Sequence, residues 1–339
     1  MNNLIRLGTP RPMRLVIAAV ALAAALAWIA AGQGHAAASD NAQLARNGVL
    51  TVTGTPGNDK IALRLATNDP ATIQIDFGDN NSPDFSFARA DVKRIAVDAR
   101  SGDDAVRIDE INGVFTDTIP TVLDGGPGND SLAGGSGAEL LLGGPGNDTI
   151  DGNRGNDTSA LGAGDDVFVW DPGDGSDTIA GQGGNDTMLF NGANASEVVN
   201  LAAVGNHLKF TRNVGNITMD TVGVEQVDFN ALGGADLVTV NDLKAAGVKS
   251  VNVDLGSNGA GDGAADRVVV NGTNRNDQIA VTGDAGGVKV SGLFATVGIT
   301  HAEAANDRLD INTLSGTDTV DSHGLAVGAI QLFVNGLPV

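Results

Sequence analysis

The sequence predicts an all-β protein, a parallel β-solenoid with β-rich modules on either side. A nine-residue unit recurs between residues 125 and 189, and each unit places a glycine two residues before an acid. Segments on both sides of this array alternate polar and apolar residues, which is the period of a half-buried strand. The 48 glycines and the low aromatic content of 4% indicate many turns between these strands.

Residues 1–38 are predicted to be a secretory signal peptide. Arg6, Arg11 and Arg14 precede an apolar, alanine-rich run over residues 15–31, and small residues at 36–38 supply a cleavage site near Ala38. An uncleaved membrane anchor is the alternative reading of the same run. The sequence contains no cysteine, so disulfide bonds cannot stabilise a secreted chain of this kind, and bound metal is the candidate stabiliser.

Two β-rich modules are predicted, over residues 39–124 and 190–339. They share a longer repeat in which an opening segment (53–63, 181–190 and 271–281) is followed by a closing segment of strand, glycine turn and strand (95–108, 227–240 and 309–320). Strands are also expected at 72–77, 207–210, 216–220 and 288–292. The sequence leaves open whether these modules are wider solenoid coils or a small β-sandwich. Residues 332–339 are a candidate end strand with an exposed edge.

The array over residues 125–189 contains seven nonapeptides, with a two-residue insertion at Trp170 and Asp171. A nonapeptide leaves only three residues for a strand, so each coil should consist of two units and successive coils should stack. The eighth position of a unit faces the core and is apolar except at Ser159. The sixth position is always acidic: Asp130, Glu139, Asp148, Asp157, Asp166, Asp177 and Asp186.

An 18-residue coil places every second acid on the same edge of the solenoid. One edge should carry Asp130, Asp148, Asp166 and Asp186, and the other Glu139, Asp157 and Asp177. Glycines in the turns allow positive φ and leave carbonyl oxygens bare, and calcium binds carboxylate and carbonyl oxygens together. The candidate ligand turns contain Gly126, Gly128, Gly144, Gly146, Gly155, Gly164 and Gly184. The gaps between stacked acids predict about five calcium ions, with Glu139 and a bulged turn at the insertion as the weakest places.

The units GGPGNDSLA (125–133) and GGPGNDTID (143–151) resemble the GGxGxDxUx nonapeptide of RTX (repeats-in-toxin) calcium-binding proteins. The resemblance covers about residues 125–189 and implies a parallel β-roll, a right-handed β-solenoid, with Ca²⁺ as its ligand. Asn129, Asn147, Asn156, Asp165 and Asn185, at position five, are candidates for further oxygens or for turn caps. The isolated acidic turns at Asp59, Asp104, Asp236, Asp277 and Asp318 are interpreted first as capped turns without metal, with calcium binding as the alternative.

The expected function is that of a secreted calcium-binding protein with a structural or adhesive role at the cell surface or in the matrix. The net charge of −21 disfavours nucleic acid and anionic membranes as partners and favours cations. Cell-surface or matrix glycans and proteins are candidate partners. The sequence contains no G-x-S-x-G, H-E-x-x-H or Walker A motif, so no catalytic residue is nominated. A secreted β-helical enzyme or accessory module acting on polysaccharide is the alternative.

Overall fold

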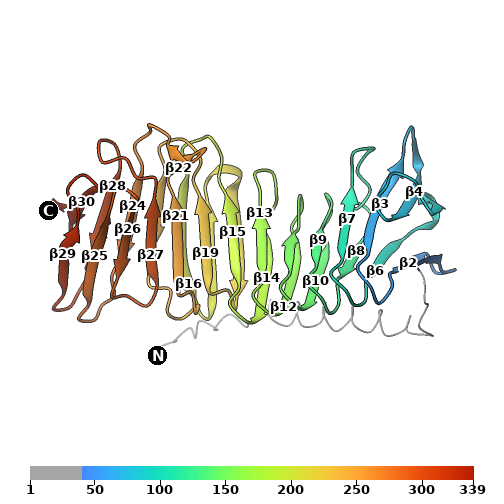
Figure 1. The fold of residues 1–339 in the computed structure, drawn as a ribbon, viewed down its shortest axis with the longest axis horizontal. Helices are drawn as coiled ribbons and strands as arrows, with labels where there is room; N and C mark the ends of the chain where they lie inside the picture. The colour runs from blue at the N-terminus through green and yellow to red at the C-terminus, as the bar shows by residue number, and fades with distance from the viewer. Residues whose placement is uncertain (1–39) are drawn as a thin grey trace, which may run out of the picture. The chain divides into compact units, whose positions relative to one another are not determined.

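The computed structural model describes residues 40–339, and the predicted signal peptide lies outside them. The regular structure of this part is β-strand apart from two single-turn 3-10 helices, η1 (Arg89–Asp91) and η2 (Val214–Asn216). Two long sheets and a two-stranded ribbon, β22 (Gly256–Ser257) with β23 (Ala260–Gly261), account for the strands (Figure 1). The all-β prediction is confirmed. Between residues 40 and 339, no helix has the length and apolar character needed to cross a membrane.

The first sheet has 15 strands. In spatial order they are β1 (Asn41–Leu44), β2 (Val49–Thr53), β6 (Arg94–Asp98), β8 (Thr121–Asp124), β10 (Leu140–Pro145), β12 (Thr158–Ala163), β14 (Thr178–Gly183), β18 (Ile217–Val222), β17 (His207–Arg212), β16 (Val198–Val204), β20 (Leu237–Val240), β24 (Arg267–Asn271), β28 (Arg308–Asn312), β30 (Gln331–Val334) and β31 (Leu337–Pro338).

The second sheet has 14 strands. In spatial order they are β29 (Thr319–Leu325), β25 (Gln278–Asp284), β26 (Gly287–Ser291), β27 (Thr296–Thr300), β21 (Ser250–Asp254), β19 (Gln226–Asn230), β15 (Thr187–Asn191), β13 (Val167–Trp170), β11 (Thr149–Asp151), β9 (Ser131–Ala133), β7 (Ala105–Asp109), β3 (Lys60–Ala66), β4 (Asp69–Phe77) and β5 (Phe85–Ala88).

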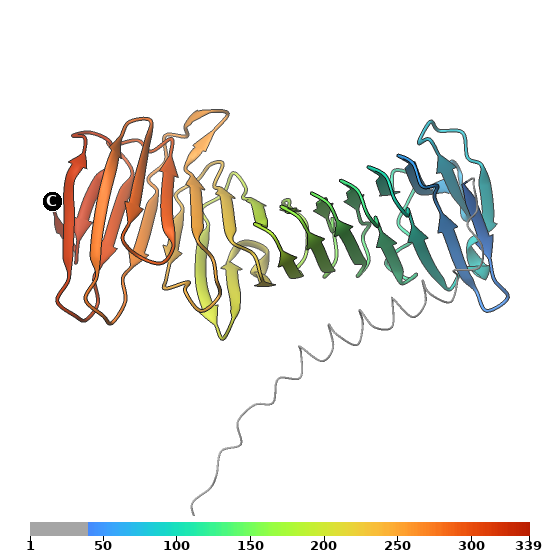
Figure 2. The same cartoon turned by 60° about the horizontal axis from the view of Figure 1, so that its bottom comes forward.

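In the nonapeptide array the chain alternates between the two sheets at every strand, from β9 to β15 (Figures 1 and 2). Neighbouring strands within a sheet are parallel. Leu140 lies opposite Thr158 in the 15-stranded sheet, and Thr149 lies opposite Val167 in the 14-stranded sheet. Both offsets are 18 residues, so each coil consists of two nonapeptides. The predicted parallel solenoid with stacked coils is confirmed.

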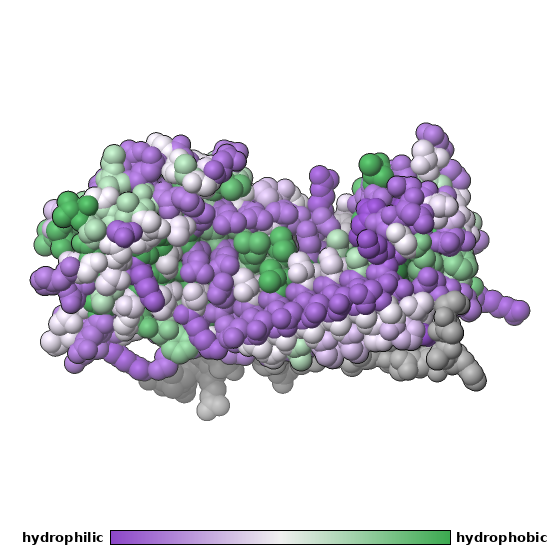
Figure 3. Space-filling model, in the orientation of Figure 1, coloured by the Kyte–Doolittle hydropathy of each residue, from purple (hydrophilic) through white to green (hydrophobic). Residues whose placement is uncertain are grey.

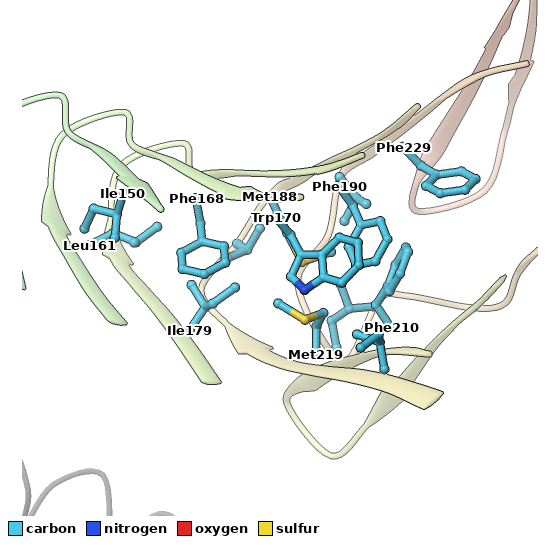
Figure 4. Packing of buried hydrophobic residues seen from close by; sticks show 14 of the residues in the cluster. Ile150, Leu161, Phe168, Trp170, Ile179, Met188, Phe190, Phe210, Met219 and Phe229 are labelled. Carbon is cyan, nitrogen blue, oxygen red and sulfur yellow. The ribbon is translucent and has the colours of Figure 1, made fainter. Parts of the chain in front are cut away.

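The interior of the array is filled by the side chains at position eight of each unit. Leu141, Ile150, Phe168, Ile179 and Met188 are all fully buried, because alternate strand residues point inward from both sheets. Figure 4 shows this column continuing into an aromatic cluster. There the ring of Trp170 stacks on that of Phe190 at 3.9 Å between centroids, and Phe190 contacts Phe210 at 4.4 Å.

The two-residue insertion lengthens one coil without breaking the stack. Thr158 lies opposite Thr178, an offset of 20 residues, and pairing continues along both strands. The added residues extend β13 by placing Trp170 in the core and form a bend in which the Asp174 N–H donates to the Asp171 carbonyl. The extra length is therefore absorbed in a wider turn, as the sequence predicts.

The flanking modules are wider coils of the same solenoid. Both sheets run through residues 124–125 and 189–190 without a break, so the module boundaries stay predictions. The added length lies in antiparallel segments, β3–β4–β5, β16–β17–β18 and β25–β26–β27. The end strand predicted over 332–339 forms the hairpin β30–β31, in which Phe333 pairs with Pro338.

Candidate metal-binding edges

The acids at position six lie on two edges of the solenoid, in the order that the 18-residue spacing predicts. We call first edge the row of turns that leads into the 14-stranded sheet, and second edge the row that leads into the 15-stranded sheet. Asp130, Asp148, Asp166 and Asp186 precede β9, β11, β13 and β15 on the first edge. Glu139, Asp157 and Asp177 precede β10, β12 and β14 on the second edge.

One oxygen of each array aspartate accepts a backbone N–H from the neighbouring coil. Asp148 Oδ1 accepts the backbone N–H of Asp130 at 2.8 Å, and Asp166 Oδ1 accepts that of Asp148 at 2.8 Å. The second edge repeats the contact, with Asp157 Oδ1 accepting the Glu139 N–H at 2.7 Å. We call this series of hydrogen bonds between buried aspartates and the neighbouring coil the buried ladder. It continues across the insertion, where Asp177 Oδ1 accepts the Asp157 N–H at 2.8 Å across 20 residues.

The other oxygen of these aspartates is buried without a hydrogen-bond partner anywhere in residues 40–339. This is true of Oδ2 in Asp130, Asp148, Asp157, Asp166, Asp177 and Asp186, whose side chains are at most 2% exposed. An ionised oxygen removed from water without a partner costs several kcal/mol, roughly, unless a cation compensates it. These carboxylates therefore fit a metal ion, and they would supply its charged ligands.

Glu139 differs from the aspartates of the array. Its longer side chain turns back onto its own turn, where Oε2 accepts the Gly135 N–H and Oε1 accepts the Gly137 N–H, both at 3.1 Å. Both oxygens are thus already satisfied by protein groups. This arrangement agrees with Glu139 being the weakest ligand of the predicted set, although its metal binding stays a prediction.

The turn glycines bring carbonyl oxygens to the same edges. The seven predicted glycines, Gly126, Gly128, Gly144, Gly146, Gly155, Gly164 and Gly184, all have φ between +88° and +150°. A Cβ atom on Gly144 would lie 2.1 Å from the Gly126 carbonyl oxygen, and one on Gly146 would lie 1.7 Å from that of Gly128. Successive turns thus stack too closely for any side chain, and their bare carbonyls are available as neutral ligands beside the carboxylates.

The residues at position five cap the turns of the neighbouring coil, and their role as further calcium ligands stays a prediction. Asn129 Oδ1 accepts the Asn147 N–H at 2.8 Å, Asn147 Oδ1 accepts the Asp165 N–H at 3.0 Å, and Asp165 Oδ1 accepts the Asn185 N–H at 2.8 Å. This exposed ladder runs in the opposite direction to the buried one, because here the earlier coil supplies the acceptor. On the first edge, neighbouring coils of the array are therefore joined by two side-chain hydrogen bonds, one buried at position six and one exposed at position five.

Burial dominates the electrostatics of both edges. It raises the pKa of Asp130 to about 7, and the neighbouring carboxylates of Asp148 and Asp104 add to the rise. Burial likewise raises the pKa of Asp177 to about 7 and that of Asp148 to about 6. Within residues 40–339 no three acidic or histidine side chains gather closely enough to hold a metal by themselves. A bound ion would draw on backbone carbonyls as well.

We expect acid to stabilise the array when calcium is absent. Folding raises the pKa values of Asp130, Asp148 and Asp177 above the ordinary value of 3.8, so the folded state binds more protons than the unfolded state. This contribution is complete below pH 4 and is lost as pH rises through about 6 to 7. In EDTA, the β signal in far-UV circular dichroism should therefore be larger at pH 5 than at pH 8, and the array should show a urea transition at pH 5. An equal or larger β signal at pH 8 would contradict the expectation.

Two of the isolated turns are capped as expected. Asp59 Oδ2 accepts the backbone N–H of Thr55, and Asp277 Oδ2 accepts that of Thr273, both at 2.6 Å. Asp104 and Asp236 are different. They are 2% exposed, and Oδ2 of each has no hydrogen-bond partner within residues 40–339.

Sequence reasoning missed a third ladder. Asp236 Oδ1 accepts the Glu197 N–H at 2.7 Å, and Asp266 Oδ1 accepts the Asp236 N–H at 2.8 Å. Asp236 still follows Gly234 by two residues, but Glu197 and Asp266 have no glycine at that position, so the glycine spacing does not reveal that these three acids stack. The protein supplies a cation to this ladder, since Arg212 Nε lies 2.7 Å from Glu197 Oε1.

Stacked glycine turns with buried carboxylates on both edges define a calcium-binding β-roll. The comparison with protein families agrees: the chain carries RTX calcium-binding nonapeptide repeats, matched in four copies over residues 122–138, 134–168 and 173–194. A comparison with curated proteins found no match to the chain.

Proposed function

We propose that the chain is a secreted protein whose β-roll is completed by calcium and serves a structural or adhesive role at the cell surface or in the matrix. The observation that carries this proposal is the set of six array aspartates with a buried, unpartnered Oδ2. Calcium would supply the positive charge that these oxygens lack. The aspartates would hold the ion, and the turn carbonyls would complete its oxygen shell.

The donor set favours calcium over transition metals. The candidate ligands are carboxylate and carbonyl oxygens, which suit hard cations, and the sequence contains no cysteine thiolate. Three gaps on the first edge and two on the second support about five ions. Extracellular calcium modules typically bind in the range of about 10⁻⁴ to 10⁻³ M, so folding would follow export into calcium-rich medium.

A structural or adhesive role is consistent with the surface of the folded chain. Figure 3 shows hydrophilic residues gathered in a band across the region of the nonapeptide coils. Calcium on both edges would neutralise part of the net charge of −21 and allow an acidic protein to approach acidic cell-surface polymers. The proposal assigns no reaction to the chain. A reducing-end assay on candidate polysaccharides would overturn that part if it detected cleavage.

We expect the secreted protein to bind the surface of the producing cells in millimolar calcium and to be released by EDTA. The check is sedimentation of labelled protein with washed cells. The matched control is the double variant Asp148→Asn, Asp166→Asn, which keeps both Oδ1 acceptors but removes two negative ligands, and which should sediment much less in calcium. Equal sedimentation of the wild-type protein with calcium and with EDTA would contradict the adhesive role.

A further inference from the structure

The turn over residues 99–104 lies outside the matched repeats but has the backbone of a nonapeptide turn. Arg100 has φ +77° and Gly102 has φ +128°, so they occupy the positive-φ positions that Gly126 and Gly128 occupy one coil later. A Cβ atom on Gly126 would lie 1.7 Å from the Arg100 carbonyl oxygen. One on Gly128 would lie 1.7 Å from that of Gly102. The carbonyl stack of the first edge therefore includes this turn.

The hydrogen bonds across the gap between turns 99–104 and 125–130 also match those inside the array. The Asp104 N–H donates to Asp130 Oδ1 at 2.8 Å, which continues the buried ladder. The Asn129 N–H donates to Asp103 Oδ1 at 2.9 Å, which continues the exposed one. The Gly102 N–H donates to the Pro127 carbonyl at 2.9 Å, as the Gly128 N–H donates to that of Pro145 at 2.8 Å.

The gap contains the same unsatisfied oxygens as the gaps within the array. Asp104 and Asp130 are each 2% exposed, and Oδ2 of both is buried without a hydrogen-bond partner within residues 40–339. The neighbouring Asp103 adds a further carboxylate at the surface of this turn. Two buried carboxylates thus border a gap that is lined with carbonyl oxygens, and Asp103 lies beside them at the surface.

The preceding coil lacks this feature. Asp59 Oδ1 and Oδ2 both contact the Thr55 hydroxyl at 3.1 Å, and Oδ2 also accepts the Thr55 N–H at 2.6 Å. The carboxylate of Asp59 is therefore satisfied by its own turn. Thr55 thus gives Asp59 Oδ2 hydrogen-bond donors, whereas Asp104 Oδ2 has no donor within residues 40–339 and could be compensated by a cation.

We propose that a divalent cation, calcium in the extracellular setting, binds between turns 99–104 and 125–130. The row of sites on the first edge then extends one coil beyond the RTX repeats and ends where Thr55 caps Asp59. This inference rests on the proposed calcium-dependent function. It assigns Asp104 and Asp130 as the charged ligands and the carbonyls of Arg100 and Gly102 as candidate neutral ones.

The test is a count of bound calcium ions by native mass spectrometry on the secreted chain and on three variants, Asp104→Asn, Asp59→Asn and Asp148→Asn. Asparagine keeps the Oδ1 acceptor and removes the charge. We expect Asp104→Asn to lose one ion, Asp59→Asn to lose none, and Asp148→Asn to lose at least one. An unchanged count in Asp104→Asn beside a loss in Asp148→Asn would overturn this inference and leave the proposed function standing. A wild-type chain without bound calcium would overturn both.

A second variant covers the case in which Asp104→Asn does not fold. Asp103 is exposed and keeps its capping oxygen when it becomes asparagine, so Asp103→Asn should fold. Removing one negative charge beside the site should weaken one calcium-binding step roughly fivefold in isothermal titration. Unchanged affinity at every step would count against a cation in this gap.

Discussion

Removal of calcium by EDTA at pH 8 is expected to unfold residues 125–189, with loss of β signal in far-UV circular dichroism. Carboxylates on neighbouring coils repel each other by on the order of 1–4 kcal/mol per pair at surface dielectrics, and here their second oxygens are buried and unpartnered. Small domains are stable by only about 5–15 kcal/mol, so several such pairs are enough to unfold the array. Return to millimolar calcium should restore the β signal.

Tryptophan fluorescence gives this experiment a local readout. The two tryptophans are Trp28, in the predicted signal peptide, and Trp170, which is fully buried inside the array. Emission of the mature chain therefore reports on Trp170 alone and should shift to the red in EDTA. Sodium chloride at matched ionic strength should not replace calcium, because screening does not supply ligands to buried oxygens. An unchanged spectrum in EDTA at pH 8 would contradict calcium-dependent folding.

The features that follow from local spacing were the predictable ones. The nonapeptide period places Asp130 and Asp148 on one edge, because the strand between two turns has a fixed length. The same argument predicts that Gly146 needs a positive φ, which it has at +146°. One turn and one strand fit within nine consecutive residues here, so the repeating structural unit can be recognised from a short stretch of sequence.

The features that depend on contacts between distant residues could not be predicted in this way. Asp59 and Asp104 both follow a glycine by two residues, but only Asp59 has Thr55 four residues earlier to satisfy its second oxygen. Asp104 lies 26 residues before its ladder partner Asp130, because the intervening segment is longer than a coil of the array. The 18-residue period of the array therefore does not predict that Asp104 lies beside Asp130. The Arg212 contact with Glu197 likewise exists only because β16 and β17 pair as a hairpin.

The second large effect concerns a single glycine. We expect Gly146→Ala to destabilise the calcium-bound array by more than about 3 kcal/mol. A residue with a side chain held at this φ costs on the order of 1–3 kcal/mol by itself. In addition, the new Cβ atom would lie 1.7 Å from the Gly128 carbonyl oxygen, so the two turns would have to separate. Urea unfolding in calcium, followed by Trp170 emission, measures the loss.

Two matched glycines separate the contributions to this loss. Gly173 has φ +122° but no atom within 4 Å of its added Cβ, so Gly173→Ala should show the conformational cost alone. Gly183 has no positive φ and its nearest neighbour lies at 4.0 Å, so Gly183→Ala should change stability by less than about 1 kcal/mol. Only Gly146→Ala should also weaken calcium binding in isothermal titration, because it alone displaces stacked carbonyls. If Gly173→Ala were as damaging as Gly146→Ala, backbone conformation rather than close stacking of the turns would limit the stability of the β-roll.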